Sequence, residues 1–240
     1  MNAIHPPVIV WKLLNAGIPG CLIVVLATLI YGHMGVEESG LSLTESYVTE
    51  YMKMAPHWPW LIVASFSFAL LLFLLAFAFI LQGGRSPLII LGCLLLAATS
   101  MANFFVAYAP VRRVEQPPPT YEWWTPTWWF TSKTSRVPHE HGMADAYSDV
   151  HYRATRLVVV TGVSAIMLLG LGWWGFPASR GFARVTVLAA MAMSVLFLMG
   201  DNWTVRRGLW QRLGFTLMYA WLWLGWFQIR SARSRVTVAE

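Results

Sequence analysis

The hydrophobic positions of this chain fall into six long runs, separated by polar segments of very unequal length. A helix needs about 20 consecutive apolar residues to cross the hydrocarbon core of a bilayer. Four runs meet that length, the fifth is marginal, and the sixth carries Arg212 near its start. We therefore predict an all-α fold, a polytopic integral membrane bundle of six transmembrane helices that forms one domain over residues 1–240. The predicted helices cover about residues 8–31, 58–81, 87–109, 154–176, 182–199 and 209–229.

The polar connections predict the topology. Residues 82–86 and 177–181 are short turns, whereas residues 32–57 and the extramembrane segment 110–153 are long. Six spans would place both termini beside the short turns, at what we call the short-turn end, and the long connections at the opposite, long-loop end. Arginines flank the short turns, which favours cytoplasmic termini in a cell-membrane protein. A plain count of Lys and Arg, ten at the long-loop end against seven, favours the opposite orientation.

Composition excludes a soluble protein. Hydrophobic residues make up 57% of the chain and charged residues only 12%, whereas a soluble domain carries about 25% charged residues. The net charge of +6 is that of many nucleic-acid-binding proteins, but most Lys and Arg residues bracket the apolar runs. Basic residues at membrane ends are the simpler explanation. The expected partners are therefore the lipid bilayer and other membrane subunits, and not nucleic acid.

The long segment before the fourth predicted helix is rich in tryptophan. Two pairs, Trp123-Trp124 and Trp128-Trp129, lie a few residues apart. Tryptophan favours the headgroup region, where its ring is apolar and its N–H stays hydrated. We expect this segment to lie on the membrane surface as an interfacial anchor. A platform for carbohydrate or lipid headgroups is the alternative.

The densest group of metal-capable side chains also precedes the fourth predicted helix. It comprises His139, His141, Asp145, Asp149 and His151. In a helix, residues 141, 145 and 149 would share one face. Imidazole with carboxylate suits zinc, iron or manganese, so a divalent metal that activates a water is one hypothesis. The spacing matches no established metal motif, and a solvated, mixed-charge approach to the helix is the alternative.

Polar residues at the helix ends predict a ligand-binding pocket at the long-loop end. The candidates are Asn103, Arg153, Arg156, Asp201, Arg207, Gln211 and Arg212. A lone charge inside the membrane costs about 2.5–3.5 kcal/mol. We therefore expect Arg212 to face the bundle, with Asp201 or Asn103 as its partner. Arg153 and Arg156, three residues apart, could bind an anionic headgroup. Snorkelling to the interface is the alternative for these arginines.

The start of the last predicted helix resembles a family motif. Residues 208–213, Gly-Leu-Trp-Gln-Arg-Leu, are similar to the closing G-x-x-[EQ]-R-x motif of an uncharacterised membrane family catalogued as domain of unknown function 998. The layout is similar too, with a polar, Ser-containing loop at 42–51 and His151 before the fourth helix. The family often has Pro-x-Asp after its third helix, whereas this chain has Pro-Val-Arg at 110–112. The resemblance implies a six-helix bundle and no particular activity.

Three functions of different classes remain open on the sequence. The first is a membrane protein that binds a lipid or small ligand in the polar pocket of the long-loop end. The second is an accessory subunit of a larger membrane complex. The alternative to both is a membrane-embedded, metal-dependent hydrolase or lipid-modifying enzyme that uses the cluster at 139–151.

Overall fold

The described part of the chain is helical. The computed structural model describes residues 8–35, 42–44, 56–83, 86–108, 142–202 and 206–237, with only the backbone described at 83, 142–149, 152, 201–202, 207 and 232–237. These ranges hold six long helices and no β-strand. The helices are α1 (Val8–Gly32), α3 (Trp58–Gly83), α4 (Pro87–Tyr108), α6 (Gly142–Trp174), α7 (Arg180–Asn202) and α8 (Arg207–Thr237), with a single 3₁₀ turn, η4 (Pro177–Ser179), before α7. The tryptophan-rich segment lies outside the described residues.

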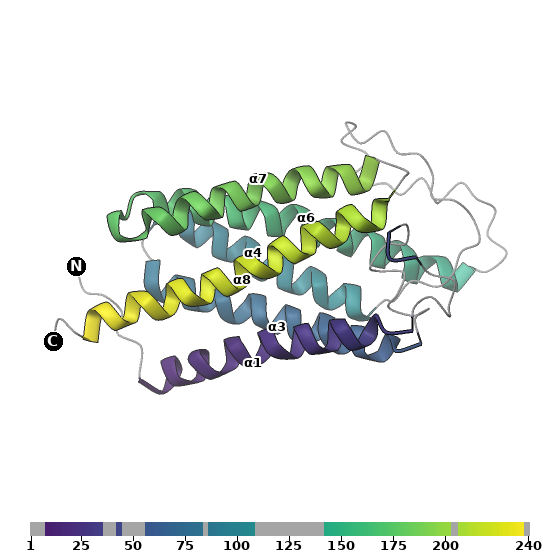
Figure 1. The fold of residues 1–240 in the computed structure, drawn as a ribbon, viewed down its shortest axis with the longest axis horizontal. Helices are drawn as coiled ribbons and strands as arrows, with labels where there is room; N and C mark the ends of the chain where they lie inside the picture. The colour runs from purple at the N-terminus through teal and green to yellow at the C-terminus, as the bar shows by residue number, and fades with distance from the viewer. Residues whose placement is uncertain are drawn as a thin grey trace.

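The helices run side by side along the length of the molecule (Figure 1). Each helix packs on the next one along the chain, from α1 with α3 through to α7 with α8, and α8 also contacts α1 and α3. The first turn of α1 and the last turns of α8 lie at the same end of the bundle (Figure 1). At the opposite end, α6 projects beyond its neighbours, because it begins at Gly142 rather than at Ala154.

Five of the six helices are long and apolar enough to cross a membrane: residues 8–32, 58–82, 87–108, 153–174 and 177–200. The chain is therefore a multi-pass membrane protein in which lipid contact is expected. The sixth helix, α8, is not apolar enough to belong to this group. Hydropathy therefore supports five of the six predicted spans. The middle of α8 is rich in tryptophan, whose ring carries an N–H that lowers hydropathy, and the helix begins with Arg207 and Arg212.

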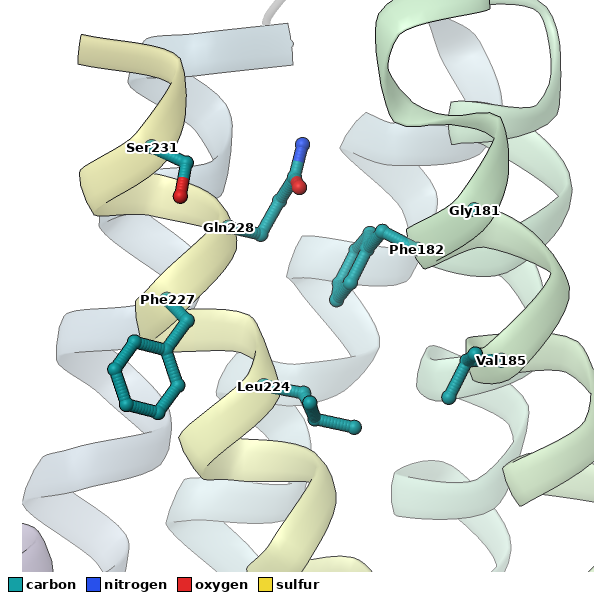
Figure 2. A pocket seen from close by; sticks show the side chains of 7 residues that line it. All are labelled: Gly181, Phe182, Val185, Leu224, Phe227, Gln228 and Ser231. Atoms are coloured by element: carbon teal, nitrogen blue, oxygen red, sulfur yellow. The ribbon is translucent and has the colours of Figure 1, made fainter. Parts of the chain in front are cut away.

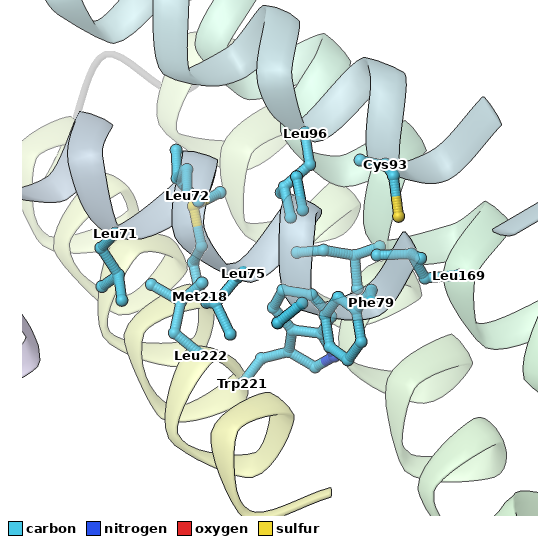
Figure 3. Close-up of a cluster of buried hydrophobic side chains, with 14 of the residues drawn as sticks. Leu71, Leu72, Leu75, Phe79, Cys93, Leu96, Leu169, Met218, Trp221 and Leu222 are labelled. Atoms are coloured by element: carbon cyan, nitrogen blue, oxygen red, sulfur yellow. The ribbon is translucent and has the colours of Figure 1, made fainter. Parts of the chain in front are cut away.

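The core forms where α3, α4, α6 and α8 meet. Phe79 of α3 and Trp221 of α8 are almost completely buried, and their ring centroids lie 6.2 Å apart. Leu96 of α4 and Leu169 of α6 belong to the same buried cluster (Figure 3). On the outside, large apolar side chains stay exposed, as with Leu188 at 64%. This pattern suits a bundle whose outer surface faces lipid rather than water.

Small side chains bring α4 and α6 together along the most extensive helix contact of the described chain. A Cβ atom added at Gly92 would lie 3.1 Å from both the Ala165 carbonyl oxygen and the Leu169 nitrogen, which are backbone atoms of α6. A Cβ atom at Gly172 would lie 3.0 Å from the Ile89 nitrogen of α4. Small residues at such contacts allow close packing in a membrane, where lipid tails remove the hydrophobic drive for helices to associate.

Hydrogen bonds from polar side chains join the helices at several levels. Ser100 Oγ donates to the Ala69 carbonyl over 2.7 Å, which links α4 to α3. The Tyr219 hydroxyl donates to the Leu22 carbonyl, which links α8 to α1. Trp221 Nε1 donates to Thr186 Oγ1 over 3.1 Å, which links α8 to α7. Each bond satisfies a polar group that lipid could not solvate.

Candidate functional site

The polar site predicted at the long-loop end is built around the first turns of α8. Arg206 precedes this helix with a φ of 60°, a left-handed conformation that sets the direction in which the helix starts. The Leu209 N–H donates to the Thr44 carbonyl over 2.9 Å. Thr44 belongs to a tight turn in which its own N–H bonds to Ser42 Oγ. Residues 42–44 therefore contact the start of α8 through the Leu209 N–H, which also donates to the Arg206 carbonyl over 3.0 Å.

Gln211 and Arg212 follow in the next turn, and both side chains turn away from lipid. Gln211 is buried, with 8% of its surface exposed. Arg212 is half-buried, and its Nε and Nη2 atoms have no accessible surface. Arginine stays protonated even when it is buried. The bundle therefore carries a fixed positive charge here, as the prediction that Arg212 faces the bundle requires.

His33 is the described titratable neighbour on which that charge acts. It follows the last residue of α1, and its Nδ1–H donates to the Leu29 carbonyl over 2.7 Å. Burial lowers the pKa of His33 below its ordinary value, the bond to Leu29 opposes this shift, and the positive charge of Arg212 lowers the pKa further. Neutral imidazole is thus favoured beside a permanent cation.

His33 is not among the residues predicted from the sequence. Asp201 or Asn103 was predicted as the neighbour of Arg212, because a buried charge needs an acidic or polar partner. The only signal for His33 was its position directly after an apolar run, on the side of the membrane where α8 begins.

The Asn103 side chain forms hydrogen bonds between two helices. It is buried, and its Nδ2 donates to the Ser65 carbonyl over 2.6 Å and to Ser65 Oγ at 3.0 Å. Ser65 Oγ in turn donates to the Asn103 carbonyl over 3.4 Å. These bonds join α3 to α4. Asn103 therefore has a structural role between α3 and α4, and its ligand-binding role stays a prediction.

His151 also bonds to a neighbouring helix. Its side chain is completely buried, and its Nδ1 lies 3.1 Å from the Val106 carbonyl oxygen. A carbonyl only accepts hydrogen bonds, so Nδ1 carries the proton. Val106 lies in the last turn of α4, where carbonyl oxygens receive no hydrogen bond from an N–H of the same helix. His151 of α6 therefore caps α4.

The remaining candidates are only partly described. Arg153 is exposed and Arg156 is half-buried, one turn apart on α6. Asp201 and Arg207 lie in the last turn of α7 and the first turn of α8, where only the backbone is described. For these four residues, ligand binding stays a prediction.

The metal hypothesis gains no support from the described chain. His139 and His141 lie outside the described residues, and Asp145 and Asp149 lie on α6 without described side chains. Among the residues whose side chains are described, no three His, Cys, Asp or Glu side chains form a group that could hold an ion. The described residues also give no evidence for a role as an accessory subunit. A metal at residues 139–151 therefore stays a prediction.

Comparison with known proteins gives a family but no activity. A family model described as "Protein of unknown function (DUF998)" matches residues 20–226, which include the motif at the start of α8. No curated protein and no solved structure matches the chain significantly.

Proposed function

We propose a function for this chain, which belongs to the family described as protein of unknown function (DUF998), from the chemistry at the start of α8. The protein is a six-span cell-membrane protein, a single transmembrane domain with cytoplasmic termini. At the long-loop end it binds an anionic group, a phosphate or a carboxylate, of a lipid headgroup or of a small molecule. Arg212 is the principal anion-binding residue, and Gln211 is a neutral donor beside it.

One observation carries the proposal, namely the positive field of a buried guanidinium group. The Nε and Nη2 atoms of Arg212 are buried, so water screens its charge poorly. The positive charge of Arg212 lowers the pKa of His33. An anion that reaches this position is attracted by the same field. Arginine stays protonated, so this attraction is permanent and does not require the anion to touch the buried Nε and Nη2 atoms.

The sixth span is part of the proposal. α8 packs on α7 and contacts α1 and α3, so it belongs to the same bundle as the five apolar helices. It also buries Met218, Trp221 and Leu222 in the common core. A helix packed in this way crosses the membrane with its neighbours, and its arginines then lie at the two membrane surfaces.

His33 supplies a local test of anion binding. Histidine-selective labelling and NMR titration of the protein in detergent would follow the pKa of His33, with its resonance assigned by its loss in His33→Gln. Addition of inorganic phosphate, or of phosphatidylglycerol in mixed micelles, should raise this pKa, because an anion beside Arg212 cancels part of its repulsion. A response to phosphatidylglycerol alone identifies a lipid headgroup, and a response to phosphate identifies a free anion.

Three variants sharpen the test. Arg212→Gln should raise the pKa of His33 without any anion and abolish the response to one. Arg212→Lys keeps the charge and should keep the pKa low. Arg184→Gln removes a charge at the short-turn end and should behave as the wild type. If the pKa of His33 ignores both anions in the wild type, the anion-binding proposal is wrong.

A further inference from the structure

A second feature lies at the short-turn end, between α7 and α8. A groove of about 280 Å³ opens there on the outer surface of the bundle. It is lined by Gly181, Phe182 and Val185 of α7 and by Leu224, Phe227, Gln228 and Ser231 of α8. Phe182, Leu224 and Gln228 point into the space between the two helices (Figure 2).

The groove changes from polar to apolar along its length. α7 and α8 are antiparallel, and Gln228 Nε2 donates to Ser179 Oγ over 2.8 Å, so Gln228 and Ser231 lie level with the start of α7. One to two turns farther into the bundle, the walls are Val185 and Leu224, which are 47% and 42% exposed. Phe227, which is 50% exposed, lies next to Gln228 at the level of the mouth. The candidate span formed by α7 begins at Pro177. The polar mouth therefore lies at the membrane surface, and the apolar walls lie at acyl-chain depth.

Three exposed arginines lie at the same end of the bundle as the mouth of the groove. Arg180 and Arg184 stand beside lining residues of α7, and Arg230 stands beside Ser231 on α8; all three are exposed. The guanidinium carbon of Arg230 lies 5.7 Å from the centre of the Trp226 ring, and neither residue lines the groove. The acidic residues of the described chain, Asp145, Asp149 and Asp201, all lie toward the other end of the bundle.

We infer that this groove binds one anionic glycerophospholipid. The phosphate lies near the Gln228 amide and the Ser231 hydroxyl, and the exposed Arg180, Arg184 and Arg230 give this end of the bundle a positive potential. One acyl chain lies along the apolar walls. Basic pockets between transmembrane helices bind anionic headgroups in this manner, and the charge around the mouth favours such a lipid over a zwitterionic one. The inference is independent of the anion site at Arg212, which lies at the opposite end of α8.

Two variants test the groove without loss of the fold. A Cβ atom at Gly181 meets no heavy atom within 4 Å, so Gly181→Leu should fill the groove and leave the packing intact. Gly20→Leu is its matched control, since Gly20 is also helical and exposed with nothing within 4 Å. For charge, Arg184→Gln is compared with Lys12→Gln, which removes an exposed cation of α1 at the same end.

Native mass spectrometry should count the lipids that stay bound after the detergent-solubilised protein is mixed with equal amounts of phosphatidylglycerol and phosphatidylcholine. We expect the wild type to retain one phosphatidylglycerol more than Gly181→Leu does, namely the lipid in the groove. Arg184→Gln should weaken its binding about fivefold, and Gly181→Leu should abolish it. Gly20→Leu and Lys12→Gln should bind as the wild type does.

Equal retention of the two lipids, or full retention in Gly181→Leu, would overturn the inference. Loss of phosphatidylglycerol in Arg212→Gln with retention in Gly181→Leu would also overturn it, and would assign the anionic lipid to the long-loop end. Loss in Gly181→Leu with an unresponsive His33 would support the groove and reject the anion site at Arg212.

Discussion

Replacement of Gly92 by alanine tests the close contact between α4 and α6. The new Cβ atom would lie 2.9 Å from Leu169 Cγ and 3.1 Å from two backbone atoms of α6. Ordinary contacts between carbon atoms are about 3.5–4.0 Å. The Leu169 side chain can turn aside, but the backbone of α6 can give way only if the helices separate. Overpacking of this kind typically costs about 1–3 kcal/mol.

Alanine also favours the helix itself by about 0.5–1 kcal/mol over glycine, so a control is needed to remove this contribution. Gly20→Ala provides it, because a Cβ atom at Gly20 of α1 meets no heavy atom within 4 Å. We expect Gly20→Ala to be slightly stabilising. The free energy of unfolding of Gly92→Ala should lie about 1–3 kcal/mol below that of Gly20→Ala.

The assay is reversible unfolding in mixed micelles with increasing sodium dodecyl sulfate, followed by far-UV circular dichroism. Both variants should unfold in a single transition, so that their free energies can be compared. Equal free energies of unfolding for the two variants would refute the argument, because they would show that α4 and α6 do not meet at Gly92.

Two further predictions concern polar groups of the long-loop end. Burial and the charge of Arg212 lower the pKa of His33 below its ordinary value of 6.5, so the unfolded chain takes up a proton before the folded protein does. The free energy of unfolding should therefore decrease as the pH falls below about 6.5. The same assay on His33→Gln should show a smaller decrease. The same pH dependence in the wild type and in His33→Gln would contradict the prediction. A double-mutant cycle of Ser65→Ala and Asn103→Leu should give a coupling between about 0.6 kcal/mol, the average measured for hydrogen bonds between transmembrane helices, and about 1.7 kcal/mol, the largest value. Strictly additive effects would mean that the bond between the two side chains contributes nothing.

Local sequence determined where the helices are. A segment such as Leu70–Leu81 has no polar side chain, and a backbone in lipid must satisfy its own hydrogen bonds, which a helix does within the segment. Five helices consequently begin at or within two residues of the predicted position: α1, α3, α4, α7 and α8. The start of α6 was harder to place, because residues 142–153 are polar and their helix projects beyond the neighbouring helices.

The motif at the start of α8 could also be recognised from neighbouring residues of the sequence alone. Gly208, Gln211 and Arg212 sufficed for the resemblance to the family that the comparison then confirmed. They also marked Arg212 as a charge that had to be buried. The side chains that surround it could not be identified in the same way.

Only the tertiary structure decided which polar side chains meet. Asn103 bonds to Ser65, and His151 bonds to Val106. Each pairing depends on the rotation and the height of one helix against another. In a soluble protein the apolar stripe of a helix reveals its inward face. Here lipid is as apolar as the core, so the inward and outward faces have nearly the same composition. The contacts of small residues such as Gly92 set the rotation, and they become visible only once α4 and α6 are packed together.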